Sequence, residues 1–112
     1  MNEPLAAALR NLFHQDAAWR AEAAAVIRDL SVDLADFLPA VAGVLVVSAL
    51  IESEEDPYEQ ILNTLGELSV RSGIPLAVLT PLRHIEAAEP WEVEYIEDIL
   101  ENARYHGVGQ EK

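Results

Sequence analysis

The sequence predicts an all-α protein of about six helices, paired as antiparallel helical hairpins in a single domain. Hydrophobic residues recur at helical spacing along most of the chain, and a proline or a capping acid precedes most of these stretches. One short phrase also occurs twice, and no segment alternates hydrophobic and polar residues as a half-buried strand would. We expect the domain to span residues 1–106 and residues 107–112 to form a flexible tail.

The first two helices are predicted from their start signals and their hydrophobic stripes. Pro4 suits the first position of a helix, and Asp16 is a good N-cap for a second one. The stripes expected to face the core are, in the first helix, Leu5, Leu9, Leu12 and Phe13, and in the second, Trp19, Ala23, Val26, Ile27 and Leu30.

The stretch FLPAVAGVLVVSALI, residues 37–51, carries no charge. It is shorter than the roughly twenty residues that a membrane-spanning helix needs. Periodicity alone cannot separate a buried helix from a buried strand here. We favour a helix because no other segment looks like a partner strand. A helix that is hydrophobic on every side should be covered by neighbours all round.

Three further helices are expected in the second half of the chain. Asp56 should cap the fourth, with Pro57 at its first position, Glu59 completing a capping box and Gly73 ending the helix. The fifth runs from Pro75 and is interrupted by Pro81, which lacks an N–H donor. The inner faces should contain Ile61, Leu62, Leu65 and Leu68 in the fourth helix, and Val93, Ile96, Ile99, Leu100 and Ala103 in a sixth that opens at Glu89 and Pro90.

The repeated phrase is EEDPYEQIL, from Glu54, and AEPWEVEYI, from Ala88. Each places an acid, a proline, an aromatic residue and a glutamate before a hydrophobic run. A unit of about 30 to 45 residues built from two antiparallel helices is typical of an α-helical repeat array. We therefore interpret the phrase as the turn inside a structural unit that recurs.

The segment VLTPLRHIEAAEPWEVEYIEDIL, residues 78–100, resembles a HEAT-like repeat. The resemblance rests on a first helix with Pro81 among leucines, the turn at Glu89 and Pro90, and a second helix that begins near Val93. It implies stacked helical hairpins, although Glu94 stands where the family favours arginine, so it does not imply that family's Asp–Arg ladder. A compact six-helix bundle is the alternative arrangement.

The charge balance is strongly acidic, with 20 Asp and Glu against 7 Lys and Arg, a net charge of −13. Nucleic acids and anionic membranes are disfavoured as partners, because binding them requires clustered basic residues. No Lys or Arg lies between Arg28 and Arg71, or between Arg83 and Arg104. Such a surface favours a basic protein partner, or serves only to keep the protein in solution.

Motifs for chemistry are missing from the sequence. There is no cysteine, and neither Glu-x-x-His nor His-x-x-x-His spacing occurs around His14, His84 or His106. No glycine-rich phosphate loop or serine elbow is present. We therefore expect a protein that is not an enzyme, with no catalytic residues, no metal site and no cofactor. The amino terminus lacks signal-peptide features, so the expected location is cytoplasmic.

Two acidic clusters and two rings are the candidate partner-binding residues. A solvated face is the alternative interpretation for the acids, and packing between helices is the alternative for the rings. The candidates are Glu52, Glu54, Glu55, Asp56 and Glu59 at the first phrase, and Trp91, Glu94, Tyr95, Glu97, Asp98 and Glu101 at the second. If units stack, both clusters should lie on the same edge. Of the rings, we expect Tyr95 to be the more exposed.

The chain is similar overall to the small, acidic, helical immunity proteins that bacteria encode beside polymorphic toxins. This resemblance implies that it binds a basic toxin domain and neutralises it by covering its functional surface. The acidic residues would then steer the association and confer specificity. Two other hypotheses are a structural or regulatory adaptor, either monomeric or homodimeric, and a helical enzyme with an unrecognised carboxylate site.

Overall fold

The computed structural model describes residues 3–30, 37–71, 74–85 and 89–107, and the side chains of these residues as far as Ala103. Within these ranges all regular structure is helical, which confirms the predicted all-α fold. The elements are α1 (Glu3–Asn11), α2 (Ala17–Leu30), α3 (Leu38–Ile51), α4 (Glu55–Arg71), α5 (Leu76–Leu79), the 3-10 helix η2 (Thr80–His84) and α6 (Pro90–Gly107). The helical prediction for residues 37–51 is therefore confirmed from Leu38 onward.

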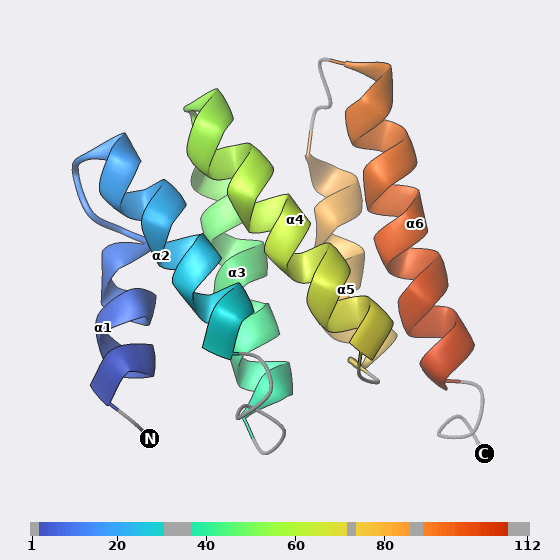
Figure 1. Ribbon diagram of the computed structural model, residues 1–112. Coiled ribbons are helices and arrows are strands. Elements are labelled where there is room, and N and C mark those ends of the chain that lie inside the picture. The colour runs from blue at the N-terminus through green and yellow to red at the C-terminus, as the bar shows by residue number, and fades with distance from the viewer. Residues whose placement is uncertain (1–2, 31–36, 72–73, 86–88, 108–112) are drawn as a thin grey trace.

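The helices form three antiparallel pairs: α1 with α2, α3 with α4, and α5 and η2 with α6 (Figure 1). In Figure 1, α2, α4 and α6 lie side by side in front and run in the same direction, while α3 and α5 lie behind them. The starts of α2, α4 and α6 consequently lie at one end of the molecule, at the top of the view. We call this the turn end.

Polar contacts tie the first pair to the second. The guanidinium of Arg20 on α2 donates two hydrogen bonds to the carboxylate of Glu52 at the end of α3. Deeper in the structure, Thr64 Oγ1 donates to the carbonyl oxygen of Ala24 over 2.7 Å. Because Thr64 and Ala24 are both buried, this bond satisfies polar groups that water cannot reach.

The expectation that the charge-free helix is covered on all sides is wrong. One side of α3 packs on α4, α5 and η2 and buries residues such as Val41 and Leu45. The opposite side remains open, because the described helices lie against α3 from one side. As a result, large hydrophobic side chains at Phe37, Val47, Leu50 and Ile51 are exposed.

Several predicted local signals are confirmed. Asp16 caps α2, since its Oδ1 accepts the Ala18 N–H over 2.9 Å. The α-helical part of the fifth helix ends at Leu79, and a 3-10 helix replaces it around Pro81. The inner face predicted for α4 is buried along its length.

Other local predictions need correction. Helix α4 begins at Glu55, so Asp56 lies in its first turn and is not its cap. On α6, Val93 is exposed and Glu92 is buried in its place, because a Glu92 oxygen accepts the Glu89 N–H over 2.8 Å. In the first pair, Phe13 and Trp19 are exposed as well.

Two expectations fall at the edges of the described chain. Gly73, the predicted stop of the fourth helix, lies outside the described residues, as does the expected tail apart from Gly107 at the end of α6. No helix in the described ranges combines the length and the hydropathy needed to cross a membrane.

Candidate functional site

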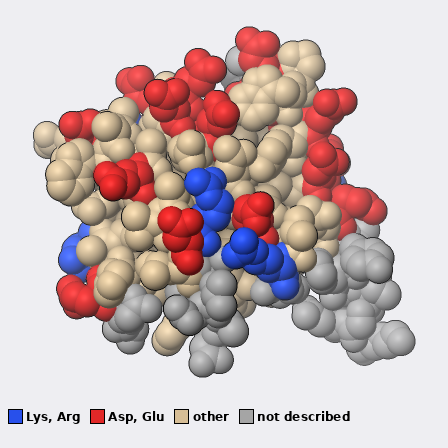
Figure 2. All heavy atoms as spheres, in the orientation of Figure 1, with Lys and Arg blue, Asp and Glu red and all other residues tan. Residues whose placement is uncertain are grey.

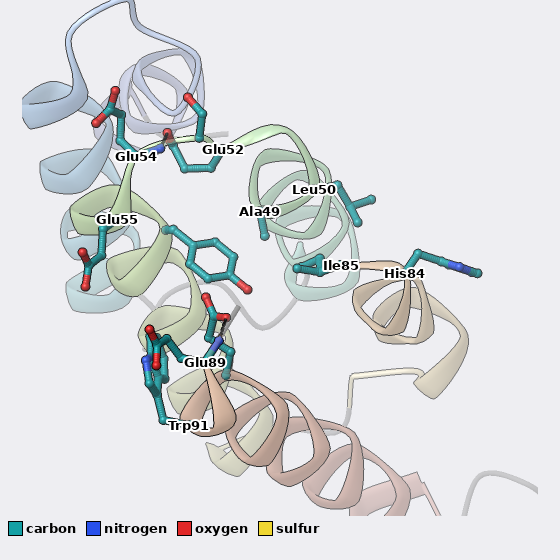
Figure 3. A pocket seen from close by; sticks show the side chains of 12 residues that line it. Ala49, Leu50, Glu52, Glu54, Glu55, His84, Ile85, Glu89 and Trp91 are labelled. Atoms are coloured by element: carbon teal, nitrogen blue, oxygen red, sulfur yellow. Dashed lines mark hydrogen bonds between the residues drawn. The ribbon is translucent and has the colours of Figure 1, made fainter. Parts of the chain in front are cut away.

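The two copies of the repeated phrase meet across a groove at the turn end (Figure 3). Its volume is about 640 Å³, and it lies between the start of α4 and the start of α6. The groove is lined by Ala49, Leu50, Glu52, Ser53, Glu54, Glu55, Tyr58, His84, Ile85, Glu89, Trp91 and Glu92. Its size is in the range of pockets that hold small ligands or side chains of a partner.

The fold places acids from two helix starts along the rim of this groove and hydrophobic groups along a further wall. Glu54 and Glu55 come from the start of α4, and Glu89 from the start of α6, so the parallel course of these two helices brings their first turns together. In Figure 3, Ala49 and Ile85 form this wall, and His84 points away from the groove. The site is thus a half-apolar cleft rimmed by carboxylates.

Tyr58 is a buried member of the groove lining. Its side chain is only 8% exposed, and its hydroxyl oxygen is buried without a hydrogen-bond partner. Burial, followed by the negative charge of Glu92, raises the pKa of Tyr58 to about 12. The repeated phrase places an aromatic residue at this position but gives no sign of the unpartnered hydroxyl.

Glu52 is the one candidate acid that the structure withdraws from the surface. Its side chain is 3% exposed, and its oxygens accept hydrogen bonds of 2.7 and 2.9 Å from Arg20. Burial alone would raise the pKa of Glu52, but the hydrogen bonds from Arg20 and the Glu54 N–H outweigh it and lower the pKa. Glu52 is therefore part of the packing between helix pairs.

The other acids of the first cluster remain at the surface. All are exposed, and no ion pair within the described part of the chain neutralises them. They are Glu54, Glu55, Asp56 and Glu59. Across the groove from Glu54 and Glu55, Trp91 is 37% exposed, so an aromatic ring stands next to the acidic rim.

The second acidic cluster is exposed along α6 and leads away from the groove. Figure 2 shows acidic side chains over the turn end and down the side of the molecule formed by α6. Glu94, Glu97, Asp98 and Glu101 are all exposed there. Glu97 Oε2 lies 3.5 Å from Arg83 Nε, so these two residues form a solvent-exposed ion pair. The two clusters therefore approach each other at the turn end, where Trp91 shares the groove with Glu54 and Glu55.

Tyr95 is less exposed than Trp91, so the expected order of the two rings is wrong. The Tyr95 ring is half-buried and packs against the core, and it meets the Trp91 ring edge-on at 6.5 Å. A Cβ atom on Gly66 would lie 2.7 Å from the Tyr95 hydroxyl, so this glycine lets α6 approach α4. The spacing pattern could not reveal that partner on another helix.

The histidines do not gather into a site. His14 Nδ1 accepts the Asp16 N–H over 2.9 Å, and its ring stacks on Trp19 with centroids 4.9 Å apart. Among the described residues, no group of three or more His, Cys, Asp or Glu side chains is placed to hold a metal ion. Four of the candidate residues, Glu52, Glu54, Glu55 and Trp91, line the groove, and the other eight lining residues were not candidates. Of these eight, Tyr58, Glu89 and Glu92 belong to the repeated phrase, which was the signal that could have found them.

The chain matches no protein-family model, and no curated protein or solved structure shows significant similarity to it.

Proposed function

We propose that this chain is an acidic protein-binding module that uses the turn end and the exposed side of α6 to bind a basic protein. The observation that carries the proposal is the convergence of two helix starts, from α4 and α6, whose exposed carboxylates rim a single groove. Among the described residues, Arg20 binds Glu52 and Arg83 lies beside Glu97, whereas Glu54, Glu55, Asp56 and Glu59 are exposed and take part in no ion pair. Most of this negative surface is left for a partner.

The charge pattern supports partner binding over solvation alone. Like charges three or four residues apart on a helix cost a few tenths of a kcal/mol per pair, and Glu94, Glu97 and Asp98 form such pairs. A basic partner would relieve this repulsion and would be drawn in faster by the field of the whole protein. Exposed Trp91 beside the acids adds the kind of ring that is enriched in interfaces.

The specific form of this function that we propose is neutralisation of a bacterial toxin domain, because the chain resembles many immunity proteins in being small, acidic and helical. A toxin that binds nucleic acid or phosphates presents a basic surface, which a negative groove and helix would cover. A gene for a toxin-like protein directly beside the gene for this chain would support this form. If no neighbouring gene encodes a toxin-like protein, the chain would be a binding module that does not neutralise a toxin.

The test measures association with the partner that co-purifies from the native host. We expect that partner to have an isoelectric point above about 9 and its association rate to fall at least about tenfold between low and high salt. At the same salt concentration, the variant Glu94→Lys with Asp98→Lys should associate more slowly than wild type. The matched control, Glu22→Lys with Asp29→Lys, makes the same change of charge on exposed positions of α2 and should have a smaller effect.

Two results would contradict the proposal. One is an association rate that does not change with salt, because steering by exposed charges is screened over about 10 Å at 0.1 M salt. The other is an equal loss for the α2 and α6 variants, because that would show a response to net charge and not to the proposed surface.

A second candidate function, a homodimeric adaptor, is favoured by the open side of α3. Residues spaced three and four apart form a hydrophobic stripe there: Phe37, Ala40, Val44, Val47 and Ile51. This spacing is that of a helix-pairing seam. Because residues 37–51 contain no charge, a second copy of the chain could approach along α3 with less repulsion than along the acidic surfaces.

The dimer hypothesis is tested by the mass of the protein in solution. If α3 is the interface, Val47→Lys converts a dimer to a monomer, whereas Val93→Lys does not. Val93 is the matched control because it is 53% exposed on α6, compared with 50% for Val47. A wild-type protein that remains monomeric at high concentration would rule out this candidate.

A further inference from the structure

We propose that the groove at the turn end receives an arginine side chain of the basic partner, with Tyr58 as a hydrogen-bond acceptor inside it. This inference rests on the proposed function and specifies the chemistry of one part of its surface. Three features of the groove support it: the charge of its lining, the unpartnered hydroxyl and the hydrophobic wall.

The charge of the lining selects a cation. Glu54, Glu55 and Glu89 are exposed at the rim, and Glu92 lies behind them as a buried carboxylate. One Glu92 oxygen already accepts the Glu89 N–H. No arginine or lysine is among the lining residues, so a cation entering from outside would meet only negative and neutral groups.

The Tyr58 hydroxyl oxygen can accept a hydrogen bond from a donor that enters the groove. A buried hydroxyl without a partner is unfavourable in the free protein, and it gains a bond when a donor reaches it. Tyr58 comes from the first full turn of α4 and lines the groove together with residues of both acidic helix starts, Glu55 and Glu89. A cationic donor at this point would bond the hydroxyl and neutralise the Glu92 carboxylate behind it.

The shape and the hydrophobic wall favour arginine among organic cations. A metal ion is a poor fit, because no three carboxylate or histidine side chains of the described chain converge on one point. A guanidinium has five donors and can bond carboxylates and a hydroxyl together, whereas an ammonium is a compact point charge. Its aliphatic stem can lie along Ala49 and Ile85, and its plane can stack on Trp91.

The entry route is open at the acidic rim. Glu89 and Trp91 are exposed, so changing their rotamers displaces few packed atoms. Glu52, by contrast, is already bound to Arg20, so its carboxylate is not available to a ligand. The partner's arginine would therefore bind the carboxylates of the rim and not that of Glu52.

The experiment titrates the full-length protein with three capped tripeptides that differ only at the central residue: arginine, lysine or citrulline. Backbone amide shifts measured by NMR report where each peptide binds. We expect the arginine peptide to bind with a dissociation constant of about 1 mM and to shift the amides around Tyr58, Glu89 and Trp91. The lysine peptide should bind at least about threefold more weakly, and citrulline, which has the same shape without the charge, should not saturate.

Two variants separate the hydroxyl from the packing of the ring. Tyr58→Phe should weaken the arginine peptide about fivefold, the effect of one lost hydrogen bond, while keeping the fold. Ser69→Ala removes a buried hydroxyl from the same helix outside the groove and should leave the peptide affinity unchanged. Thermal unfolding of both variants verifies that each is folded.

Equal titrations with arginine and citrulline, or no saturation with arginine, would overturn the inference, because the groove would then hold water or neutral groups only. Unchanged arginine binding in Tyr58→Phe would overturn the role of the hydroxyl. The outcomes also separate this inference from the proposed function. If the protein binds its partner in a salt-dependent way but does not bind the arginine peptide, only the proposed arginine site is refuted. Saturable arginine binding without a basic partner would refute only the proposed function.

Discussion

Arg20 on α2 donates two hydrogen bonds, of 2.7 and 2.9 Å, to the carboxylate of Glu52, which lies 32 residues away at the end of α3. The same guanidinium donates to the carbonyl oxygens of His14 and Gln15 over 2.8 and 3.0 Å. Arg20 thus binds the turn after α1 and the turn after α3 together. The side chains of Arg20 and Glu52 are only 15% and 3% exposed, so solvent screens this pair less than the other ion pairs.

Replacing either member of this pair should destabilise the fold. We expect Arg20→Lys, which cannot form the fork of two bonds, and Glu52→Gln each to lower the free energy of unfolding by about 2 kcal/mol in urea denaturation. The control is Arg10→Gln, which removes an exposed pair at 3.9 Å and should cost no more than about 0.5 kcal/mol. Equal effects at Arg20 and Arg10 would contradict the structural role of Arg20.

The contribution of Glu52 should depend on pH in the acid range. Its pKa is lowered in the folded state, so the unfolded state binds more protons as the pH falls. The stabilisation is therefore complete above the ordinary value of 4.5 and is lost as the pH drops through the folded-state pKa. Urea denaturation of wild type and Glu52→Gln should show a large difference at neutral pH that shrinks below pH 4.5. A difference that is constant with pH would exclude this linkage.

Tyr58 should make stability depend on pH in the alkaline range. Burial and the charge of Glu92 raise its pKa from 10.0 to about 12, so the folded state keeps its proton where the unfolded state loses it. The associated stability is present below pH 10.0 and is lost as the pH rises toward 12. Tyr58→Phe should remove this loss and, at neutral pH, stabilise the protein by about 1 kcal/mol, because no buried hydroxyl remains unpartnered.

The measurement for Tyr58 is twofold. Phenolate absorbance against pH should lose its highest-pKa component in Tyr58→Phe, and denaturation at neutral pH should show the gain in stability. A Tyr58→Phe variant less stable than wild type would mean that the hydroxyl has a partner in the folded protein.

Two glycines on neighbouring helices should respond oppositely to alanine. At Gly66 a Cβ would lie 2.7 Å from the Tyr95 hydroxyl, so Gly66→Ala should cost about 1 kcal/mol despite the better helix propensity of alanine. At Gly43 the nearest atom, from Val78, is 4.0 Å away, so Gly43→Ala should stabilise by about 0.5–1 kcal/mol. Thermal or urea denaturation measures both.

The Gly66 effect has an internal check. In a Tyr95→Phe background the closest contact is gone, and Gly66→Ala should cost less than in wild type. Two glycine variants that both stabilise would show that α6 does not press on α4 at this point.

The candidate site was only partly predictable from the sequence. The repeated phrase marked the helix starts that flank the groove, and the exposure of Glu54, Glu55, Glu94 and Asp98 agrees with their place outside the hydrophobic stripes. The loss of Glu52 from the surface was not predictable, because its partner Arg20 is 32 residues away in the chain. The same holds for Tyr95, whose burial depends on a glycine of α4.

By itself, the sequence determined what is local: helical structure, the cap at Asp16, the break at Pro81 and an acidic surface, because backbone preferences and hydrophobic periodicity act over a few residues. The tertiary structure alone decided which side of α3 stays open, which acid is paired inside and which ring is covered. Those outcomes depend on the neighbour that another part of the chain supplies, and a pattern along one helix carries no information about that neighbour.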